Sequence, residues 1–170
     1  MSLARLIAIV PVVMLGACST VLTPPNQNIA PLINSAGAKI GQVSWWDDGN
    51  ATHLDVRIRG LSPGPHGVHL HTTGRCDAPG FTTAGGHWNP TGRQHGHQNA
   101  AGWHLGDLGN LNIRSNGTEE AMLMLPAGTN FADADGTALV IHAGPDDEMT
   151  DPSGNSGGRI ACAVIAPPAR

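Results

Sequence analysis

The length, composition and charge of the chain limit the classes of protein to which it can belong. With 170 residues it has room for one folded domain, and its 23 glycines and 13 prolines make up about a fifth of the total. Aromatic residues contribute only 4%, and no long apolar run has a helical period. The net charge of -4 and the scattered basic residues argue against nucleic-acid binding, which needs clustered lysines and arginines. This composition is typical of a loop-rich, all-β protein.

The first residues have the pattern of an export signal. A positive charge at Arg5 precedes an apolar stretch that ends in the run from Leu15 to Cys18. This run resembles the lipobox of bacterial lipoproteins, in which the signal is cleaved just before a cysteine that carries a lipid. We therefore expect a signal peptide at residues 1–17 and a lipid on Cys18 that attaches the protein to a membrane. Ordinary secretory cleavage after Ser19 is the alternative, since small residues are also correctly spaced for it.

Both kinds of cleavage place the mature chain outside the cytoplasm. We expect a location in the periplasm or cell envelope, with a tether at residues 18–34 and a single domain at residues 35–170. Cys76 and Cys162 are then an even pair within the domain, and such a pair in an oxidising compartment usually forms a disulfide. Because the loop it closes spans most of the domain, this bond would contribute on the order of 4 to 5 kcal/mol on a chain-entropy estimate.

Short strands account for most of the apolar pattern of the domain. The clearest strand is residues 54–59, where apolar and charged residues alternate strictly, and a turn at residues 47–50 joins it to residues 39–45 in a hairpin. Four further apolar runs predict strands, at residues 108–113, 121–125, 137–142 and 160–166. Short strands interrupted by glycine, proline and asparagine favour a sandwich or barrel.

The stretch from Thr72 to Gly106 has no periodicity and is far longer than an ordinary connection. Loops of this length in compact domains are usually functional or disordered. Just before it, the strand period places His69 and His71 on one face, where two imidazoles can converge on one ion. For this pair alone, an incidental polar face is the alternative.

Further side chains with ligand chemistry follow the pair. The long loop contains His87, His95 and His104, Asp107 comes directly after it, and His142 ends a later apolar run. Three histidines and a carboxylate fit a closed tetrahedral zinc site, and a cluster of imidazoles suits copper. A loop without a core of its own would be ordered by the metal. The free energy of metal binding would then contribute to the free energy of folding. A soluble loop that happens to be rich in histidine is the alternative.

Four runs resemble the signatures of the copper/zinc superoxide dismutase family, in the family's order. They are Gly67–His71, Gly85–Pro90, His104–Asn110 and Gly157–Cys162. The similarity covers residues 30–166. It implies a Greek-key β-barrel of immunoglobulin-like sandwich architecture, with about eight strands and long metal-binding loops.

The resemblance also implies the metal ligands. The copper ligands would be His69, His71, His87 and His142, and the zinc ligands would be His87, His95, His104 and Asp107. His87 belongs to both sets, because in the family this ring loses both protons and bridges the metals. Asp146 corresponds to the carboxylate that links a copper histidine to a zinc histidine, here His69 and His95.

Arg159 corresponds to the active-site arginine of the family, and Cys76 with Cys162 to its intrasubunit disulfide. A charged guanidinium near the open copper position can bind a small anion, whereas a surface arginine at a strand end is the alternative. The implied reaction is the dismutation of superoxide: one superoxide reduces Cu(II) and leaves as O₂, and a second reoxidises Cu(I) and leaves as hydrogen peroxide. Zinc would be structural because it is d¹⁰, and His87 would pass a proton to the departing peroxide.

The chain departs from eukaryotic relatives in the segment before Arg159, which lacks their lysines. The source of electrostatic guidance is therefore open, with Arg75 and Arg93 as candidates. A copper- and zinc-binding envelope lipoprotein without turnover is the alternative function, and loss of Arg159 or of a copper ligand would favour it. The oligomeric state is also open, a homodimer included. Three histidines have no assigned role: His53, His66 and His97.

Overall fold

Alternating apolar side chains place eight strands around one core. The computed structural model describes residues 27–169, so the predicted signal peptide and Cys18 lie outside the described residues. The strands are β1 (Asn28–Asn34), β2 (Lys39–Asp47), β3 (Ala51–Arg59), β4 (Gly64–His71), β5 (Asp107–Ile113), β6 (Thr118–Pro126), β7 (Thr137–His142) and β8 (Arg159–Ala166). A short 3-10 helix, η1 (Thr82–Ala84), lies between β4 and β5. Between residues 27 and 169 no helix is long and apolar enough to cross a membrane.

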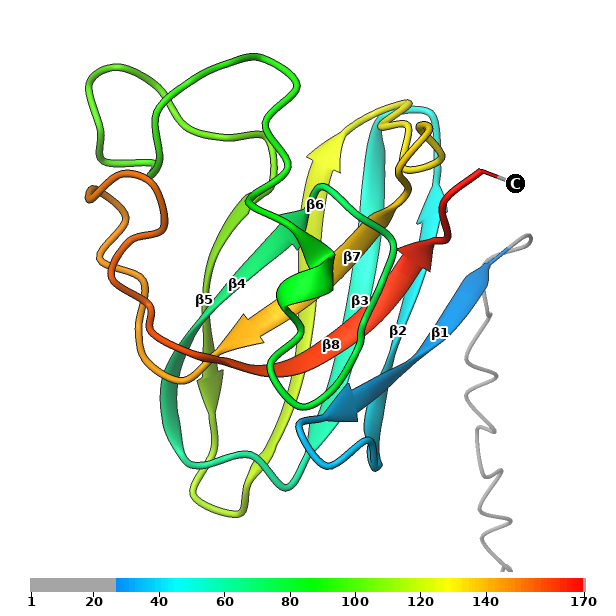
Figure 1. Ribbon diagram of the computed structural model, residues 1–170, viewed down its shortest axis with the longest axis vertical. Coiled ribbons are helices and arrows are strands. Elements are labelled where there is room, and N and C mark those ends of the chain that lie inside the picture. Colours follow the sequence, from blue (N-terminus) through cyan, green and yellow to red (C-terminus); the bar gives the residue numbers. More distant parts are fainter. Residues whose placement is uncertain (1–26, 170) are drawn as a thin grey trace, which may run out of the picture.

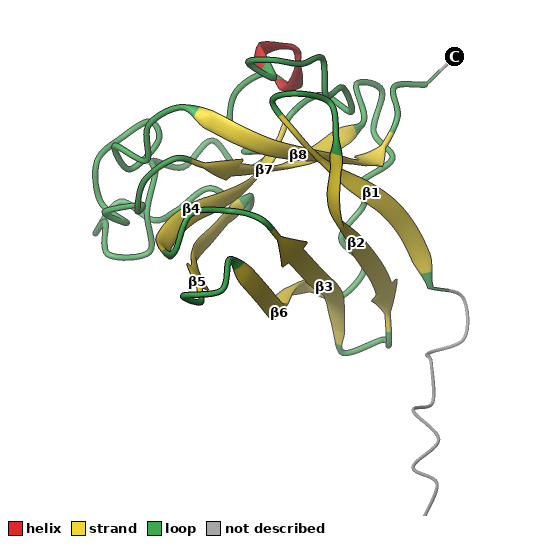
Figure 2. Ribbon diagram, turned by 90° about the horizontal axis from the view of Figure 1, so that it is seen from below, coloured by secondary structure: helices red, strands yellow, loops and turns green. Residues whose placement is uncertain are grey.

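The strands form a nearly closed antiparallel barrel (Figure 1). Their hydrogen-bonded order is β5-β4-β7-β8-β1-β2-β3-β6, and a turn at residues 114–117 brings β5 beside β6. Around the barrel, β4, β5 and β6 are therefore neighbours and β7 returns beside β4, which is the Greek-key arrangement. Figure 2 shows the resulting curl of the sheet. The predicted all-β Greek-key barrel of about eight strands is confirmed.

Side chains from every part of the barrel fill its interior. In β3 the predicted alternation is visible, since Leu54, Val56 and Ile58 are buried while the residues between them face outward. Every residue of β7 is buried, because a second apolar cluster covers the outer side of this strand. In that cluster Phe81 and Ala84 of the long loop pack on the strands. The loop is thus anchored to the barrel wall.

The domain begins earlier in the chain than the sequence predicted. Residues 28–34, which we assigned to the tether, form β1 and pair with both β2 and β8. Ala30 and Leu32 point into the core, while Pro31 and the polar residues at both ends obscure the alternation in the sequence. The prediction was wrong for these residues because their burial depends on neighbours that are distant in the chain.

Two long connections lie side by side at one end of the barrel. Residues 72–106 join β4 to β5 and residues 143–158 join β7 to β8, and Figure 1 shows the part of the first connection that follows η1 beside the second, in green and orange. The amide of Gln98 donates to the carbonyl of Glu148 over 3.0 Å, and the amide of His95 donates to Oδ1 of Asp151 over 2.7 Å. These contacts place the histidines of the long loop against the end of the barrel.

The inclusion of β1 in the domain can be tested by a core substitution. Leu32 is fully buried, so Leu32→Ala should lower the free energy of unfolding by about 2 to 5 kcal/mol through lost burial and a residual cavity. Ile29→Ala on the same strand is the control, because Ile29 is 61% exposed and its loss should cost far less. Urea unfolding of both variants measures the difference, and equal effects would contradict the assignment.

Candidate metal centre

Four imidazoles converge where β4 and β7 meet the long loop. His69 and His71 lie on one face of β4, His142 is the last residue of β7, and His87 approaches from the loop through a bridge to His71. One nitrogen from each ring lies within 4.8 Å of the nitrogens of the other three. The structure thus brings together all four residues predicted as copper ligands.

Hydrogen bonds fix the tautomer of the three strand histidines. The contacts are His69 Nε2 to Asp146 Oδ2 at 2.7 Å, His71 Nδ1 to the Gly85 carbonyl at 2.9 Å and His142 Nδ1 to the Gly157 carbonyl at 3.0 Å. Because these oxygens only accept, each of the three ring nitrogens carries the proton. The opposite nitrogen of each ring therefore presents a lone pair to the centre.

These lone pairs provide a test of whether a metal fits. The buried nitrogens Nδ1 of His69 and Nε2 of His71, His87 and His142 have no hydrogen-bond partner among the described residues. A buried polar atom without a partner costs free energy, and four such nitrogens around one point are the donor set that copper prefers. Burial also lowers the pKa of His69 to about 3, of His71 to about 2 and of His142 to about 4, so these rings are neutral near pH 7. The residues present fit a copper ion.

A second group of donors surrounds the carboxylate of Asp107. Its Oδ1 lies 2.9 Å from Nδ1 of His87, 3.0 Å from Nδ1 of His95 and 3.2 Å from Nδ1 of His104. Ligands about 2.0 Å from a zinc ion in a tetrahedron are about 3.3 Å apart, so these separations match a zinc site. The buried Nδ1 of His95 forms no hydrogen bond within the described residues, although it lies 3.0 Å from Oδ1 of Asp107. All four predicted zinc ligands are together, and the His87 ring has one nitrogen in each group.

Hydrogen bonds also orient the carboxylate of Asp107. Its Oδ2 accepts from the backbone amides of Gly96 at 2.9 Å and His104 at 3.0 Å, which leaves Oδ1 for the imidazoles. Burial alone would raise the pKa of Asp107, but His87 and His95 hold it well below its usual range. The group is therefore an anion, as a zinc ligand must be.

The carboxylate of Asp146 connects the two donor groups. It accepts from Nε2 of His69 at 2.7 Å and from Nε2 of His95 at 2.9 Å, as the resemblance implied. Burial alone would raise its pKa, but these two partners hold the pKa of Asp146 well below its usual range. Asn110 fixes its backbone from both sides, by accepting from its amide at 2.7 Å and donating to its carbonyl at 2.9 Å. Gly154 packs so closely that a Cβ there would collide with the carboxylate.

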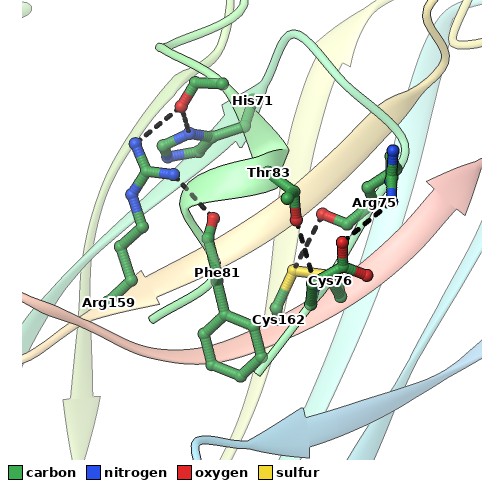
Figure 3. The surroundings of a disulfide bond; sticks show 9 residues. His71, Arg75, Cys76, Phe81, Thr83, Arg159 and Cys162 are labelled. Carbon is green, nitrogen blue, oxygen red and sulfur yellow. Dashed lines mark hydrogen bonds and ion pairs between the residues drawn. A yellow bond between two sulfur atoms is a disulfide. The ribbon is translucent and has the colours of Figure 1, made fainter. Parts of the chain in front are cut away.

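Arg159 is held by two backbone carbonyls of the long loop (Figure 3). Its Nη1 donates to Phe81 over 2.7 Å and its Nη2 to Gly85 over 2.6 Å. The four imidazoles of His69, His71, His87 and His142 are called the copper group below. The Gly85 carbonyl also accepts from His71, so one oxygen positions both the arginine and a ring of this group. Burial lowers the pKa of Arg159, but a guanidinium remains charged at neutral pH.

The predicted disulfide between Cys76 and Cys162 is present (Figure 3). It joins the start of the long loop to β8, with 5.7 Å between the two Cα atoms. Arg159 begins the same strand, and its carbonyl partners lie on the same loop. The bond therefore limits how far the arginine and its partners can separate.

A cavity of about 260 Å³ lies over the copper group. It is lined by His71, Gly86, His87, His142, Pro152, Ser153, Gly157 and Arg159. The guanidinium supplies the one permanent charge among these described lining residues. A small anion that enters the cavity would meet Arg159 and the open side of the imidazole cluster together.

His66 has no role that the sequence indicates, and the structure gives it one. This buried ring places Nδ1 at 2.7 Å from the carbonyl of His142 and Nε2 at 2.9 Å from the carbonyl of Ser62. It therefore supports the backbone of a histidine in the copper group. The available signal was strand alternation, because His66 shares its parity with the buried Val68 and Leu70.

The fold and the site together define a class: an antiparallel Greek-key barrel with two adjoining metal sites that share one imidazole. The sequence model of the family described as Copper/zinc superoxide dismutase (SODC) matches residues 39–165. The chain belongs to the copper/zinc superoxide dismutase family.

Similar proteins include enzymes and a protein named only for its likeness to them. Superoxide dismutase [Cu-Zn] 2 of Aquifex aeolicus is 38% identical over 144 residues, which cover 80% of this chain and 84% of the relative. Superoxide dismutase-like protein YojM of Bacillus subtilis is 35% identical over 143 residues, or 79% of this chain and 73% of the relative.

Solved structures with the same fold come from both kinds of relative. A crystal structure of a SOD-like protein from Bacillus subtilis has a TM-score of 0.76 and 34% identity, and the match covers 81% of this chain and 97% of that one. The Cu/Zn superoxide dismutase from Brucella abortus has a TM-score of 0.69 and 26% identity, with coverage of 82% and 99%.

The pKa shifts predict how the stability of the metal-free protein depends on pH. His69, His71 and His142 have lowered pKa values, so the unfolded chain binds protons first and stability falls as pH drops from about 6.5 towards 4. Burial alone would lower the pKa of His95 too, but Asp107 and Asp146 raise it to about 9. The contribution of protonated His95 to the free energy of unfolding is therefore complete below about pH 6.5 and is lost as pH rises through 9.

The expected result is a maximum of stability near pH 6.5 for the metal-free protein. Urea midpoints at about pH 4.5, 6.5 and 9 measure it. The metal-loaded protein is the control and should vary less between pH 6.5 and 9, because its ligand nitrogens are occupied. A midpoint of the metal-free protein that rises steadily to pH 9 would contradict the assignment.

Proposed function

We propose that the protein is a superoxide dismutase with a catalytic copper and a structural zinc. The observation that carries the proposal is the completeness of the site: four buried nitrogen lone pairs meet at one point, below a cavity that is lined by a half-buried arginine. The names of the Aquifex and Brucella relatives support this activity. A role in metal binding alone would require neither the cavity nor the arginine.

The reaction converts two superoxide anions and two protons into O₂ and hydrogen peroxide. Copper, when bound, supplies a centre that takes an electron from one superoxide and gives one to the next. His69, His71, His87 and His142 would hold this ion. His87, His95, His104 and Asp107 would hold zinc, which has no accessible second oxidation state and so fixes the loop.

Arg159 binds and orients the anion. Two of its five N–H groups are used by the carbonyls of Phe81 and Gly85, so the remaining donors are available to a ligand in the cavity. The chain as a whole is acidic, with a net charge of -4. A fixed positive charge at the base of the cavity supplies the local attraction that the overall charge does not.

His87 is placed to move a proton. Its Nδ1 faces the carboxylate of Asp107 at 2.9 Å, and its Nε2 belongs to the group below the cavity. A proton held at Nε2 therefore lies at the base of the cavity, within reach of an anion bound there. Because Asp107 is an anion, it stabilises the ring when Nε2 carries that proton.

The role of Arg159 is tested by the variant Arg159→Ala in the copper- and zinc-loaded protein. Loss of a charged hydrogen-bond donor should lower the second-order rate constant for superoxide decay by about 10- to 100-fold at unchanged metal content. Arg114→Ala is the matched control, because Arg114 is exposed and pairs with Glu119 away from the cavity. No acceleration by the parent protein at full copper occupancy would refute the enzymatic function, and equal rates for the two variants would refute the role of Arg159.

We also propose that the protein works outside the cytoplasm, attached to a membrane by a lipid on Cys18. The export pattern of residues 1–17 supports this location, as does the disulfide, since such bonds persist in oxidising compartments. Cys18→Ser should move the protein from the membrane fraction to the soluble fraction of the cell envelope. The intact mass of the mature N-terminus should show the lipid in the parent protein, and a soluble, unlipidated parent would support ordinary cleavage.

A further inference from the structure

The outer face of the barrel carries sulfur and imidazole groups that the metal centre does not use. On β6, Met122 and Met124 point outward and are 50% and 66% exposed. His53 of β3 stands directly opposite Met124, and Trp46 of β2 stands opposite His53 on its other side. The strand period keeps these side chains on one face. β6, β3 and β2 lie apart from the long loops at the metal centre (Figure 2).

His53 is oriented in the manner of a metal ligand. Its Nε2 lies 2.9 Å from Oδ2 of Asp48, whose pKa is lowered to about 2 by the amides of Ala51 and Asn50 and by His53. An ionised carboxylate only accepts, so Nε2 carries a proton, and in the neutral ring Nδ1 presents a lone pair. Ligand histidines are typically fixed through their other nitrogen by such a carboxylate. Nδ1 has no hydrogen bond to any residue in the described part of the chain.

Packing restricts the ring of His53 further. It stacks on Trp46 with 5.1 Å between ring centroids and 12° between planes. The two in-plane lone-pair directions of an imidazole point away from one another, so the edge that carries Nδ1 is turned away from Asp48. The free nitrogen is thus presented by a ring that is fixed by a hydrogen bond and a stacking contact.

The strand geometry allows the two sulfurs to reach this nitrogen. Directly opposed residues of an antiparallel pair have Cβ atoms about 5 Å apart, as for His53 and Met124, and Met122 is about 7 Å along β6 from Met124. Methionine has three rotatable side-chain bonds, so both thioethers can close on one ion. Asp55 lies opposite Met122, and its carboxylate is paired with the guanidinium of Arg57 at 2.9 Å. Thioethers are soft ligands that select Cu(I) over divalent ions.

We propose that Met122, Met124 and His53 form a second, external site for a soft monovalent cation, Cu(I), flanked by Trp46. This site is separate from the dismutase centre and does not depend on its activity. It gives the protein a surface position at which reduced copper is bound.

The test uses the full chain loaded with copper and zinc and labelled with ¹³C in the methionine methyl groups. Silver(I) is the probe, because it is a redox-inert d¹⁰ analogue of Cu(I). At one equivalent of added silver, the methyl resonances of Met122 and Met124 should move while that of Met149 should not. Met149 is the internal control, since it is 54% exposed and lies in the loop between β7 and β8.

Variants separate a specific site from general exposure. His53→Gln should weaken the affinity for silver by at least about tenfold, and so should Met124→Leu, whereas Met149→Leu should leave it unchanged. Met122 and Met124 resonances that stay in place, or that move together with Met149, would overturn the proposal. Resonances that depend on protein concentration but not on silver would show instead that this face joins two copies of the chain. Superoxide decay by Met124→Leu should equal that of the parent, so failure of this site is distinguishable from failure of the dismutase function.

Discussion

The carboxylate of Asp146 is the contact on which the two halves of the metal centre depend. It accepts from a ring on β4, His69, and from a ring on the long loop, His95, through the nitrogens that face away from the donor groups. A buried anion is tolerated only when hydrogen-bond donors surround it, and here two of the donors are candidate metal-binding rings and a third is the amide of Glu148 at 2.7 Å. One group thereby fixes two tautomers and ties a loop to the barrel. Asn110 holds the backbone of Asp146 by two hydrogen bonds, and Gly154 leaves the space that the carboxylate occupies.

The barrel and the loop contribute to the site in different ways. His71 and His142 are placed by strand register, so their spacing is set once the core folds. His87, His95 and His104 are instead on a loop with little regular structure, fixed by carbonyl contacts, the disulfide and a small apolar cluster around Phe81. A bound ion would order the donors on such a loop, so the free energy of metal binding would contribute directly to the stability of the loop.

The sequence predicted the features that leave a local pattern. Strands β3 and β7 have clear apolar runs, and both were found close to their expected bounds. The candidate ligands, which the structure brings together, could be named because the histidines and Asp107 fall in recognisable runs with a family resemblance. β1 was missed, since Pro31 and the polar ends hide its alternation and its burial comes from β2 and β8.

Contacts to backbone atoms could not be predicted from the sequence. The partners of Arg159 are carbonyl oxygens of Phe81 and Gly85, which every residue type possesses, so no residue identity reveals them. The support of His142 by His66 is likewise a contact to a carbonyl across 76 positions of the chain. Such contacts appear only when the course of the backbone is known, and they decide how firmly the predicted residues are positioned.

The two copper environments differ in the oxidation state that they favour. The buried group offers four imidazole nitrogens, a donor set compatible with both states that a redox cycle must visit. The external group offers two thioethers and one imidazole, and sulfur donors favour the reduced ion. A site for turnover must not bind one state too strongly, because the electron would then be retained. A site that only binds copper has no such constraint, so methionine is suited to the outer face of β6 and unsuited to the centre.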